Sequence, residues 1–287
     1  MHRAFLIPIL VILFSSGCIQ SIALRSTGEI VDYGLEAINE ESDLQLAEQS
    51  IASDLKLLDG LLKGDPENEH LLLMAARGYG SFALGFAEDS SPERARMFYL
   101  RARDYGLRVL THRERFKKAW DKDLGAFQQA LAEFGRDDVP AVFWTANGWG
   151  NYIRLNLTDP GAIADIPKVE SLLKFVVEHN ETYFYGGAHL AMGILLGSRP
   201  KILAGDPEGA RKHFDRCLEI SQGKFLMADV FYAMTYAVQT QNKELFSALL
   251  RKVNESSLDL LPEQRLANAI AKKKGERLLA RISDLFE

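Results

Sequence analysis

The sequence predicts an all-α protein whose helices repeat as pairs within a single domain. Apolar residues recur at three- and four-residue spacing along nearly the whole chain, which is the period of one helix face. No stretch of comparable length alternates apolar and polar residues with the period of two that a half-buried strand needs. One helix-length pattern of small and aromatic residues also occurs twice, far apart in the chain.

The helical spacing divides the chain into consecutive segments. In chain order, the expected helices include Ile30–Ile38, Leu44–Leu62, Leu71–Phe86, Met97–Leu110, Leu124–Phe134, Val142–Leu157, Val169–Val177, Phe184–Leu196, Phe214–Ile220, Leu226–Val238, Leu245–Val253 and Leu266–Phe286. Proline followed by an acid marks a helix start, because proline fits the first turn and the acid complements the helix dipole. Such pairs occur at Pro66-Glu67, Pro92-Glu93, Pro207-Glu208 and Pro262-Glu263.

Two of these prolines begin the repeated pattern. Small, aromatic and small residues follow on one helix face, at Ala95, Tyr99 and Ala102 after Pro92 and at Ala210, Phe214 and Cys217 after Pro207. The looser aliphatic set Val169, Leu173 and Val176 has the same spacing. This resembles the second helix of a tetratricopeptide repeat (TPR), in which a small residue lets the paired helix approach.

The expected first helices carry a large apolar residue one turn before a small one. These pairs are Leu72 and Ala76, Trp144 and Gly148, and Tyr183 and Gly187. The interval from the first to the second small residue of a helix pair exceeds that of the standard 34-residue repeat. The sequence therefore predicts TPR-like units with longer first helices or loops, stacked as a right-handed solenoid.

The N-terminus has the order of a bacterial lipoprotein signal peptide, over residues 1–17. A short basic stretch precedes an apolar run from Ala4 to Phe14, which is shorter than the roughly 20 residues that span a bilayer. Small residues then lead to Cys18, the expected site of lipid attachment. An ordinary secretory signal cut near Gly17 is the alternative. Either interpretation predicts export.

The remaining sequence divides into a tether over residues 18–28 and one helical domain over residues 29–287. Ile19 occupies the position where an aspartate favours retention at the inner membrane of enteric bacteria, so we expect the outer membrane. Cys18 and Cys217 are the only cysteines, which excludes a disulfide framework. The full chain has a net charge of −5, and this argues against nucleic acid as a partner.

Several longer blocks, taken together and in order, resemble one protein family. They are GSFALGFAED (Gly80–Asp89), DDVPAVFWTANGWG (Asp137–Gly150), YFYGGAHLAMG (Tyr183–Gly193), SRPKILAGDPEGARKHFDRCLEIS (Ser198–Ser221), KFLMADVFYA (Lys224–Ala233) and RLANAIAKKKGERLLARISDLF (Arg265–Phe286). The chain is similar over nearly its whole mature length to the T-component (TatT) family of tripartite ATP-independent periplasmic (TRAP) transporters. The resemblance implies a periplasmic TPR-like lipoprotein that serves a DctP-type substrate-binding protein. It also implies a homotrimer with an apolar cavity or channel in each subunit.

Residues that could carry chemistry have plainer interpretations. The strongest metal candidate is His213 with Cys217, one helical turn apart, and Asp215 between them. Cys217 occupies the small position of the repeat, however, and Asp215 points to another side of the helix. We therefore expect no metal and no cofactor.

Glycines and charge pairs within the helical patterns also indicate structure rather than catalysis. Gly78, Gly80, Gly186 and Gly187 follow no predicted strand, which favours close helix packing over a phosphate loop. Two clusters of charged residues have structural interpretations as well. We expect Asp137-Asp138 to cap the helix that enters at Val139, and Lys272–Lys274 to lie on a solvated helix face.

Aromatic and amide side chains on the inner helices are the candidate ligand or partner residues. Three consecutive aromatics, residues 183–185, cannot all face one core if they are helical, because neighbours on a helix point about 100° apart. Asparagines among the aromatics suit a cavity with apolar walls and a few hydrogen-bonding points. The predicted cavity residues are Tyr79, Trp144, Asn147, Trp149, Asn151, Tyr183, Phe184 and Tyr185.

Three classes of function remain open at this point. The first is an accessory lipoprotein of a TRAP system that docks the binding protein and holds an apolar or amphipathic organic ligand. The second is a TPR-type scaffold for envelope assembly, against which the irregular repeat length argues. The third is a peptidoglycan lytic enzyme, which needs a buried acid such as Glu170 in a substrate groove. We expect no enzymatic activity, because Glu170 falls beside a repeat core position.

Overall fold

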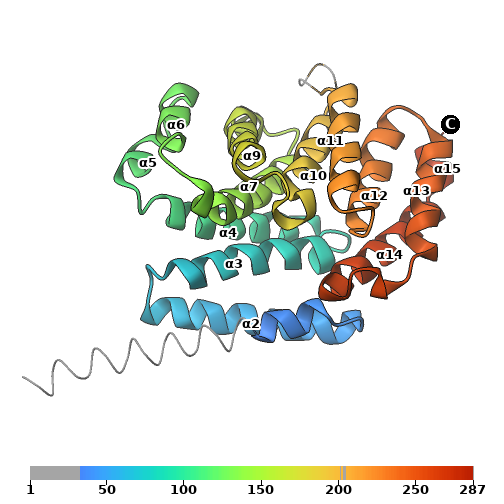
Figure 1. Ribbon diagram of the computed structural model, residues 1–287, viewed down its shortest axis with the longest axis horizontal. Coiled ribbons are helices and arrows are strands. Elements are labelled where there is room, and N and C mark those ends of the chain that lie inside the picture. The colour runs from blue at the N-terminus through green and yellow to red at the C-terminus, as the bar shows by residue number, and fades with distance from the viewer. Residues whose placement is uncertain (1–32, 201, 203–204, 287) are drawn as a thin grey trace, which may run out of the picture.

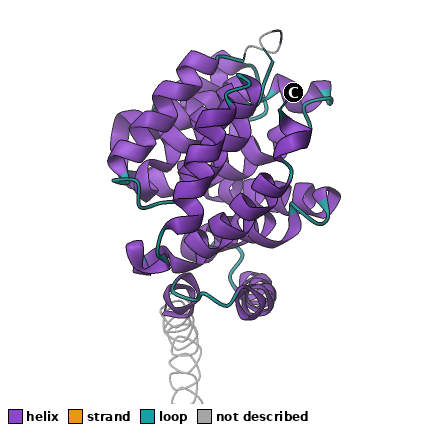
Figure 2. Cartoon of the chain, turned by 90° about the vertical axis from the view of Figure 1, so that its right-hand side faces the viewer, coloured by secondary structure: helices purple, strands orange, loops and turns teal. Residues whose placement is uncertain are grey.

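The described residues of this computed structural model are 33–200, 202 and 205–286, and they form helices and loops without a strand (Figures 1 and 2). The predicted all-α class is therefore confirmed. The signal peptide of residues 1–17, Cys18 and the tether of residues 18–28 lie outside the described residues. Among the described residues, no helix has the length and apolar content needed to cross a bilayer.

Residues 33–39 are helical, and the later elements follow in chain order. The α-helices are α2 (Leu44–Gly64), α3 (Glu69–Phe82), α4 (Pro92–Leu110), α5 (Glu114–Ala119), α6 (Leu124–Leu131), α7 (Val139–Arg154), α8 (Pro160–Ala164), α9 (Ile166–Asn180), α10 (Tyr183–Gly197), α11 (Pro207–Ile220), α12 (Met227–Tyr232), α13 (Lys243–Glu255), α14 (Arg265–Ala280) and α15 (Ile282–Leu285). Short 3-10 or π turns are η1 (Ala83–Ala87), η2 (Arg136–Asp138), η4 (Ala233–Ala237), η5 (Leu258–Leu260) and η6 (Pro262–Gln264).

Two of the four predicted proline starts are confirmed, because α4 begins at Pro92 and α11 begins at Pro207. The prediction at Pro66 is wrong. The side chain of Asn68 caps α3 instead, accepting a hydrogen bond from the Leu71 amide at 3.1 Å. Pro262 begins the short turn η6, and α14 starts after it.

The structure also gives Asp138 a different role from the predicted cap of α7. Asp138 accepts a hydrogen bond from the Gly135 amide at 2.8 Å, so it closes the turn η2 and makes no side-chain cap to α7. Its carboxylate also binds Arg113 at 2.7 Å, which ties η2 to the segment before α5. The expected cap at Val139 is therefore wrong, because the Gly135 amide and Arg113 bind the carboxylate instead.

The repeated small and aromatic residues lie where helices meet. Ala95, Tyr99 and Ala102 of α4, and Ala210, Phe214 and Cys217 of α11, are fully buried. Helix α3 packs on α4, α7 on α9 and α10 on α11, so three helix pairs follow one another along the chain. The second helix of each pair also contacts the first helix of the next, α4 on α7, α9 on α10 and α11 on α12.

One glycine sets how closely α4 and α7 approach. A β-carbon at Gly148 would lie 2.7 Å from the Arg103 amide nitrogen and 3.0 Å from the Tyr99 carbonyl oxygen. Both are backbone atoms of a helix and cannot move aside without shifting α4. The predicted packing role of this glycine is thus confirmed.

The C-terminal helix returns to the first helix pairs (Figure 1). Lys274 of α14 donates to Asp89, which follows η1, at 2.7 Å, and Arg277 binds the other carboxylate oxygen at 2.6 Å. Lys274 is 6% exposed. The expectation of a fully solvated lysine run is therefore wrong for Lys274, because Asp89 lies opposite it in the fold.

Candidate functional site

A cavity of about 130 Å³ lies between the first helix pairs and the C-terminal helices. Side chains from α3, η1, α7, α9, α10, α12 and α14 form its wall. Most of these are apolar, and the polar ones among the described lining residues are Asn39, Arg77, Ser81, Asn147, Asn151 and Gln264. An apolar wall with a few polar groups is typical of a small-molecule site. The volume is also much larger than one bound water requires.

Four of the predicted ligand residues line this cavity. They are Trp144, Asn147, Asn151 and Phe184. The amide of Asn151 donates to the Asn147 carbonyl at 3.0 Å, and its oxygen accepts from Arg154 at 3.2 Å. These bonds fix the polar group that α7 presents to the cavity.

The structure places Tyr79 and Trp149 in helix contacts rather than in the cavity wall. The Tyr79 hydroxyl donates to Asp59 of α2 at 2.8 Å. The indole nitrogen of Trp149 donates to Asp165 at 3.2 Å, and its ring is buried. Both aromatics therefore join neighbouring helices.

The aromatic run at the start of α10 is a left-handed turn. Phe184 and Tyr185 have φ angles of 47° and 59°, and Gly186 has 75°. An L-residue in this region costs about 1–2 kcal/mol, so two bulky residues here are strained. The argument from helical 100° spacing fails, because residues 184–186 are not right-handed helix.

The turn separates the three aromatic side chains. Phe184 lines both the cavity and an outer hollow on the surface, whereas Tyr183 and Tyr185 line only the outer hollow. The Trp144 indole donates to the Tyr183 hydroxyl at 3.2 Å, and Tyr185 donates to Glu263 at 3.3 Å. Tyr183 and Tyr185 therefore frame the surface next to the cavity.

Arg77 and Gln264 join Phe184 as residues that line both spaces. The Arg77 guanidinium lies 5.7 Å from the ring centroids of both Trp144 and Phe184, within cation–π range. Arg77, Phe184 and Gln264 therefore form the boundary between the cavity and the surface. Sequence reasoning missed Arg77, although a single arginine within the apolar stretch Leu71–Gly80 was the available signal.

A buried ionic cluster lies beside the cavity. Glu88 accepts hydrogen bonds from Tyr99 at 2.7 Å and from Arg154 at 2.5 Å. Burial alone would raise the pKa of Glu88, but the charges of Arg154 and Lys274 outweigh it and hold the pKa below its ordinary value. The carboxylate is therefore ionised, and one of its oxygens accepts from both Tyr99 and Arg154, which suits a structural tie better than an acid catalyst.

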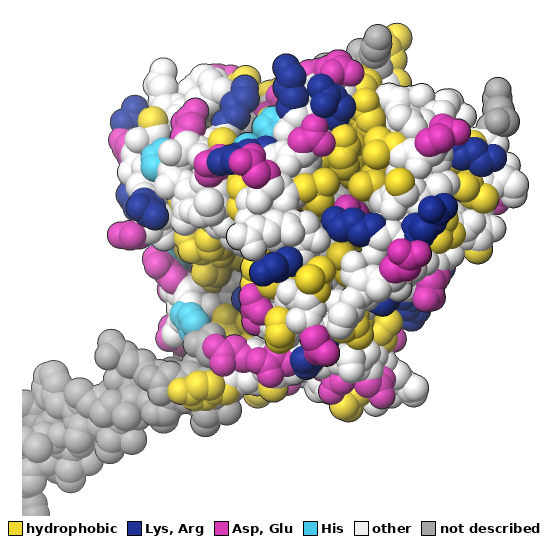
Figure 3. All heavy atoms as spheres, turned by 45° about the vertical axis from the view of Figure 1, so that its right-hand side comes forward, with side chains coloured by type: hydrophobic (Ala, Val, Ile, Leu, Met, Phe, Trp, Pro, Cys, Tyr) yellow, Lys and Arg dark blue, Asp and Glu magenta, His cyan; other side chains and the backbone are white. Residues whose placement is uncertain are grey.

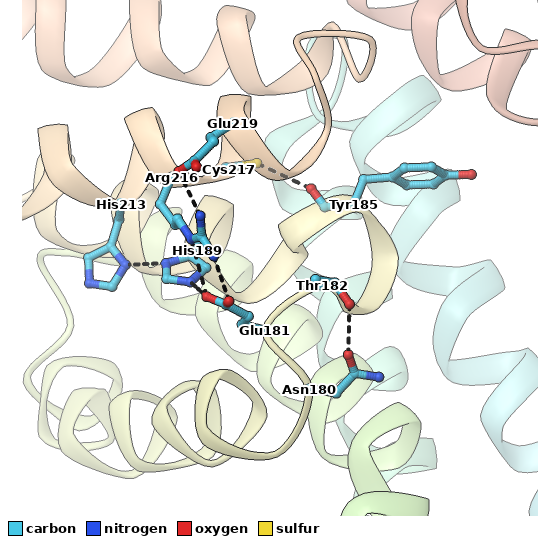
Figure 4. Close-up of polar contacts among 9 residues, drawn as sticks. All are labelled: Asn180, Glu181, Thr182, Tyr185, His189, His213, Arg216, Cys217 and Glu219. Carbon is cyan, nitrogen blue, oxygen red and sulfur yellow. Dashed lines mark hydrogen bonds and ion pairs between the residues drawn. The ribbon is translucent and has the colours of Figure 1, made fainter.

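Two histidines meet between α10 and α11 (Figure 4). The Nδ1 atoms of His189 and His213 are 2.9 Å apart. His189 Nε2 lies 3.4 Å from Glu181, whose other oxygen binds Arg216 at 2.6 Å. Burial and the neighbouring His189 lower the pKa of His213 to about 4. Burial also lowers the pKa of His189, so the neutral form is favoured for both rings at pH 7 and one ring can donate to the other.

The predicted metal candidates do not form a site. His213 contacts His189, whereas the Cys217 thiol lies 3.5 Å from the Tyr185 carbonyl and Asp215 binds Arg211 at 3.1 Å. Within the described residues, no group of three or more histidine, cysteine, aspartate or glutamate residues is placed to hold a metal ion.

Glu170, the candidate acid of the enzyme hypothesis, forms an ion pair. Its carboxylate accepts from Arg199 at 2.9 Å, and Arg199 is almost fully buried. Glu170 is not among the residues that line the cavity. An acid that is paired with a buried arginine and lies outside the cavity wall suits a structural tie better than general-acid catalysis.

Comparison with known proteins identifies the family of the chain. Residues 40–286 match the family described as the TRAP transporter T-component. No match was found among curated proteins. The match covers nearly the whole described helical domain, and the family is one of transporter components rather than of enzymes. The chain belongs to the TRAP transporter T-component family.

Proposed function

We propose that this protein is an accessory lipoprotein of a TRAP transport system that docks a DctP-type substrate-binding protein and holds an apolar or amphipathic organic ligand in its cavity. The cavity carries the ligand part of this proposal, because apolar side chains line most of it and a few amides and one arginine supply polar groups. Family membership supports a transport role.

The docking part follows from the arrangement of the helix pairs, which we propose to be a TPR-like solenoid. The buried repeat residues of α4 and α11, and the contacts between successive pairs, support this architecture. Repeat proteins use their extended surfaces to bind partners. Sedimentation velocity with the binding protein encoded at the same locus should give a homotrimer alone and a larger complex on mixing. A monomer that forms no complex would contradict docking and favour the envelope-assembly scaffold.

Membrane attachment through a lipid on Cys18 is a separate part of the proposal. An acyl anchor would hold the domain in the periplasm beside the membrane, with the outer membrane expected. Cys18→Ser should release the protein into the soluble periplasm and abolish labelling by fatty acid. Retention in the membrane fraction with unchanged labelling would contradict the anchor.

The ligand part can be tested by filling the cavity. Benzene suits a cavity of this size, since an engineered cavity of roughly 150 Å³ in another protein binds it. Wild-type protein should therefore show benzene binding by saturation-transfer NMR. Ala191→Phe, which adds a ring to the cavity wall, should abolish the signal, whereas the matched Ala52→Phe on the exposed face of α2 should leave it unchanged. No signal with wild type would contradict a ligand cavity.

A further inference from the structure

Three arginines form a row along one face of α4. Seven residues are about two helical turns, so Arg94, Arg101 and Arg108 lie on the same side at intervals of roughly 10.5 Å. Each guanidinium lies over an aromatic ring, with Arg94 5.1 Å from Phe98, Arg101 5.5 Å from Tyr79 and Arg108 5.6 Å from Tyr105. The rings hold the long side chains in place along the helix.

Most of the described arginines pair with a carboxylate, but the three arginines of the row do not. Within the described residues, carboxylates pair with Arg96, Arg103, Arg113, Arg115, Arg154, Arg199, Arg211, Arg216, Arg265, Arg277 and Arg281. Arg94, Arg101 and Arg108 form no ion pair with a described carboxylate. Arg101 donates to the Tyr79 hydroxyl at 3.4 Å and Arg108 to the Pro66 carbonyl, so all three keep their positive charge without an ion pair in the described part of the chain, whose full sequence has a net charge of −5.

Asp59 of α2 lies at this face, but other groups occupy its carboxylate. It accepts hydrogen bonds from the hydroxyls of Tyr79 and Tyr105, both at 2.8 Å, and pairs with Lys56 at 2.5 Å. Burial would raise the pKa of Asp59, but these three donors hold it below its ordinary value. The aspartate therefore fixes the aromatic floor of the row, and it forms no ion pair with the three arginines.

Apolar surface lies between the first two arginines. Met97 is 59% exposed, and Phe98 is half-buried between Arg94 and Arg101. Arginine, aromatic residues and methionine are the residue types enriched where proteins bind one another. A positive row with an apolar centre fits a partner surface on which acidic side chains flank an apolar one.

We propose that this row, Arg94, Arg101 and Arg108 with Met97 and Phe98, is the surface on which an acidic region of the substrate-binding protein docks. Partner carboxylates about 10 Å apart would meet Arg94 and Arg101, and an apolar side chain between them would cover Met97. The inference rests on the proposed docking function and specifies its site. A protein fits better than a lipid surface, because recognition of anionic membranes generally uses clusters of four to eight basic residues.

The test compares charge reversals in the full mature protein. Binding to the substrate-binding protein encoded at the same locus is measured by surface plasmon resonance at 50 and 200 mM salt. The double variant Arg94→Glu/Arg101→Glu should weaken binding at least tenfold at 50 mM salt, mainly through slower association. Arg251→Glu/Arg136→Glu, the matched control, reverses the same charge at two other arginines outside this face and should stay within twofold of wild type. Melting temperatures establish that both variants are folded.

The outcomes separate this inference from the function on which it rests. If wild type binds and the double variant binds equally well, the docking site is wrong while docking itself stands. If wild type shows no binding at tens of micromolar, docking fails. Flotation with phosphatidylglycerol vesicles completes the test, and vesicle binding that only the double variant loses would assign the row to a membrane and overturn the inference.

Discussion

Lys274 and Asp89, far apart in the sequence, form a 2.7 Å ion pair that joins α14 to the end of η1. Lys274 is almost fully buried, whereas Asp89 keeps partial contact with solvent. Ile270 of the same helix packs so closely on η1 that a β-carbon at Gly85 would lie 2.7 Å from its Cδ1. The pair and this packing hold α14 over the cavity, so the shape of the cavity depends on contact between η1 and a helix near the C-terminus.

Asp89→Asn should destabilise the fold by about 1–3 kcal/mol, because it leaves the charge of Lys274 buried without a full partner. Chemical denaturation measures this change in the free energy of unfolding. The control is Asp284→Asn, which removes a largely exposed partner of Arg281 and should change stability by less than about 0.5 kcal/mol. Equal effects of the two variants would show that the ion pair between Lys274 and Asp89 adds nothing to stability.

The close packing of α4 and α7 predicts that alanine substitution has opposite effects on stability at two glycines. Gly148→Ala should cost about 1–3 kcal/mol, because the added methyl group would overlap backbone atoms of α4. Gly60→Ala in α2 meets no atom within 4 Å and should stabilise the protein by about 0.5–1 kcal/mol. Thermal unfolding of both variants checks the prediction, and a stabilised Gly148→Ala would contradict the described packing.

The repeat pattern could be predicted from the sequence because it depends only on neighbouring turns of one helix. Ala95, Tyr99 and Ala102 are buried as their spacing indicated. The burial of Lys274 was not readable, because it depends on an aspartate brought close only by the complete fold. The same holds for Arg77, whose position at the cavity boundary requires α3, α10 and η6 together.

The residues that line the cavity were predicted only in part, for a similar physical reason. Trp144, Asn147 and Asn151 share one face of α7, so their common exposure to the cavity follows from helical spacing. Tyr183 and Tyr185 were misplaced because residues 184–186 adopt left-handed angles, which periodicity does not anticipate for aromatic residues. The sequence analysis assigned Gly186 to helix packing, whereas its φ of 75° shows that it also forms part of this turn.

Cys217 should resist modification in the folded protein. Burial raises the pKa of its thiol to about 12, so almost no thiolate is present at pH 8. Reaction with a thiol reagent should therefore be slow in buffer and fast in denaturant, with the rate followed by absorbance. The Cys18→Ser variant supplies a protein in which Cys217 is the only thiol. Rapid reaction of this variant in buffer would contradict the burial of the second repeat helix.

The histidine pair predicts weaker stability in mild acid. His213 has a pKa of about 4 when folded and an ordinary value of 6.5, so the unfolded chain binds more protons between these values. Stability from this group is complete above pH 6.5 and is lost as the pH falls toward 4. The slope is at most about 1.4 kcal/mol per pH unit, and partial exposure reduces it. Denaturant titrations from pH 7 to 4.5 measure the slope.

His213→Asn is the comparison for this pH dependence, because it retains a hydrogen-bonding group opposite His189 without a titrating ring. The variant should show a shallower loss of stability over the same pH range. If wild type and variant lose stability in parallel, the acid sensitivity arises elsewhere in the fold.

The most direct test of the account is calorimetric titration of the purified mature protein with the substrate-binding protein encoded at its locus. A transient accessory partner should bind with a dissociation constant in the micromolar range, about 8 kcal/mol, because the binding protein must leave to reach the membrane permease. Measurable heat that saturates at a fixed ratio is the predicted result. The absence of heat at tens of micromolar, with both proteins folded, would contradict the proposed role.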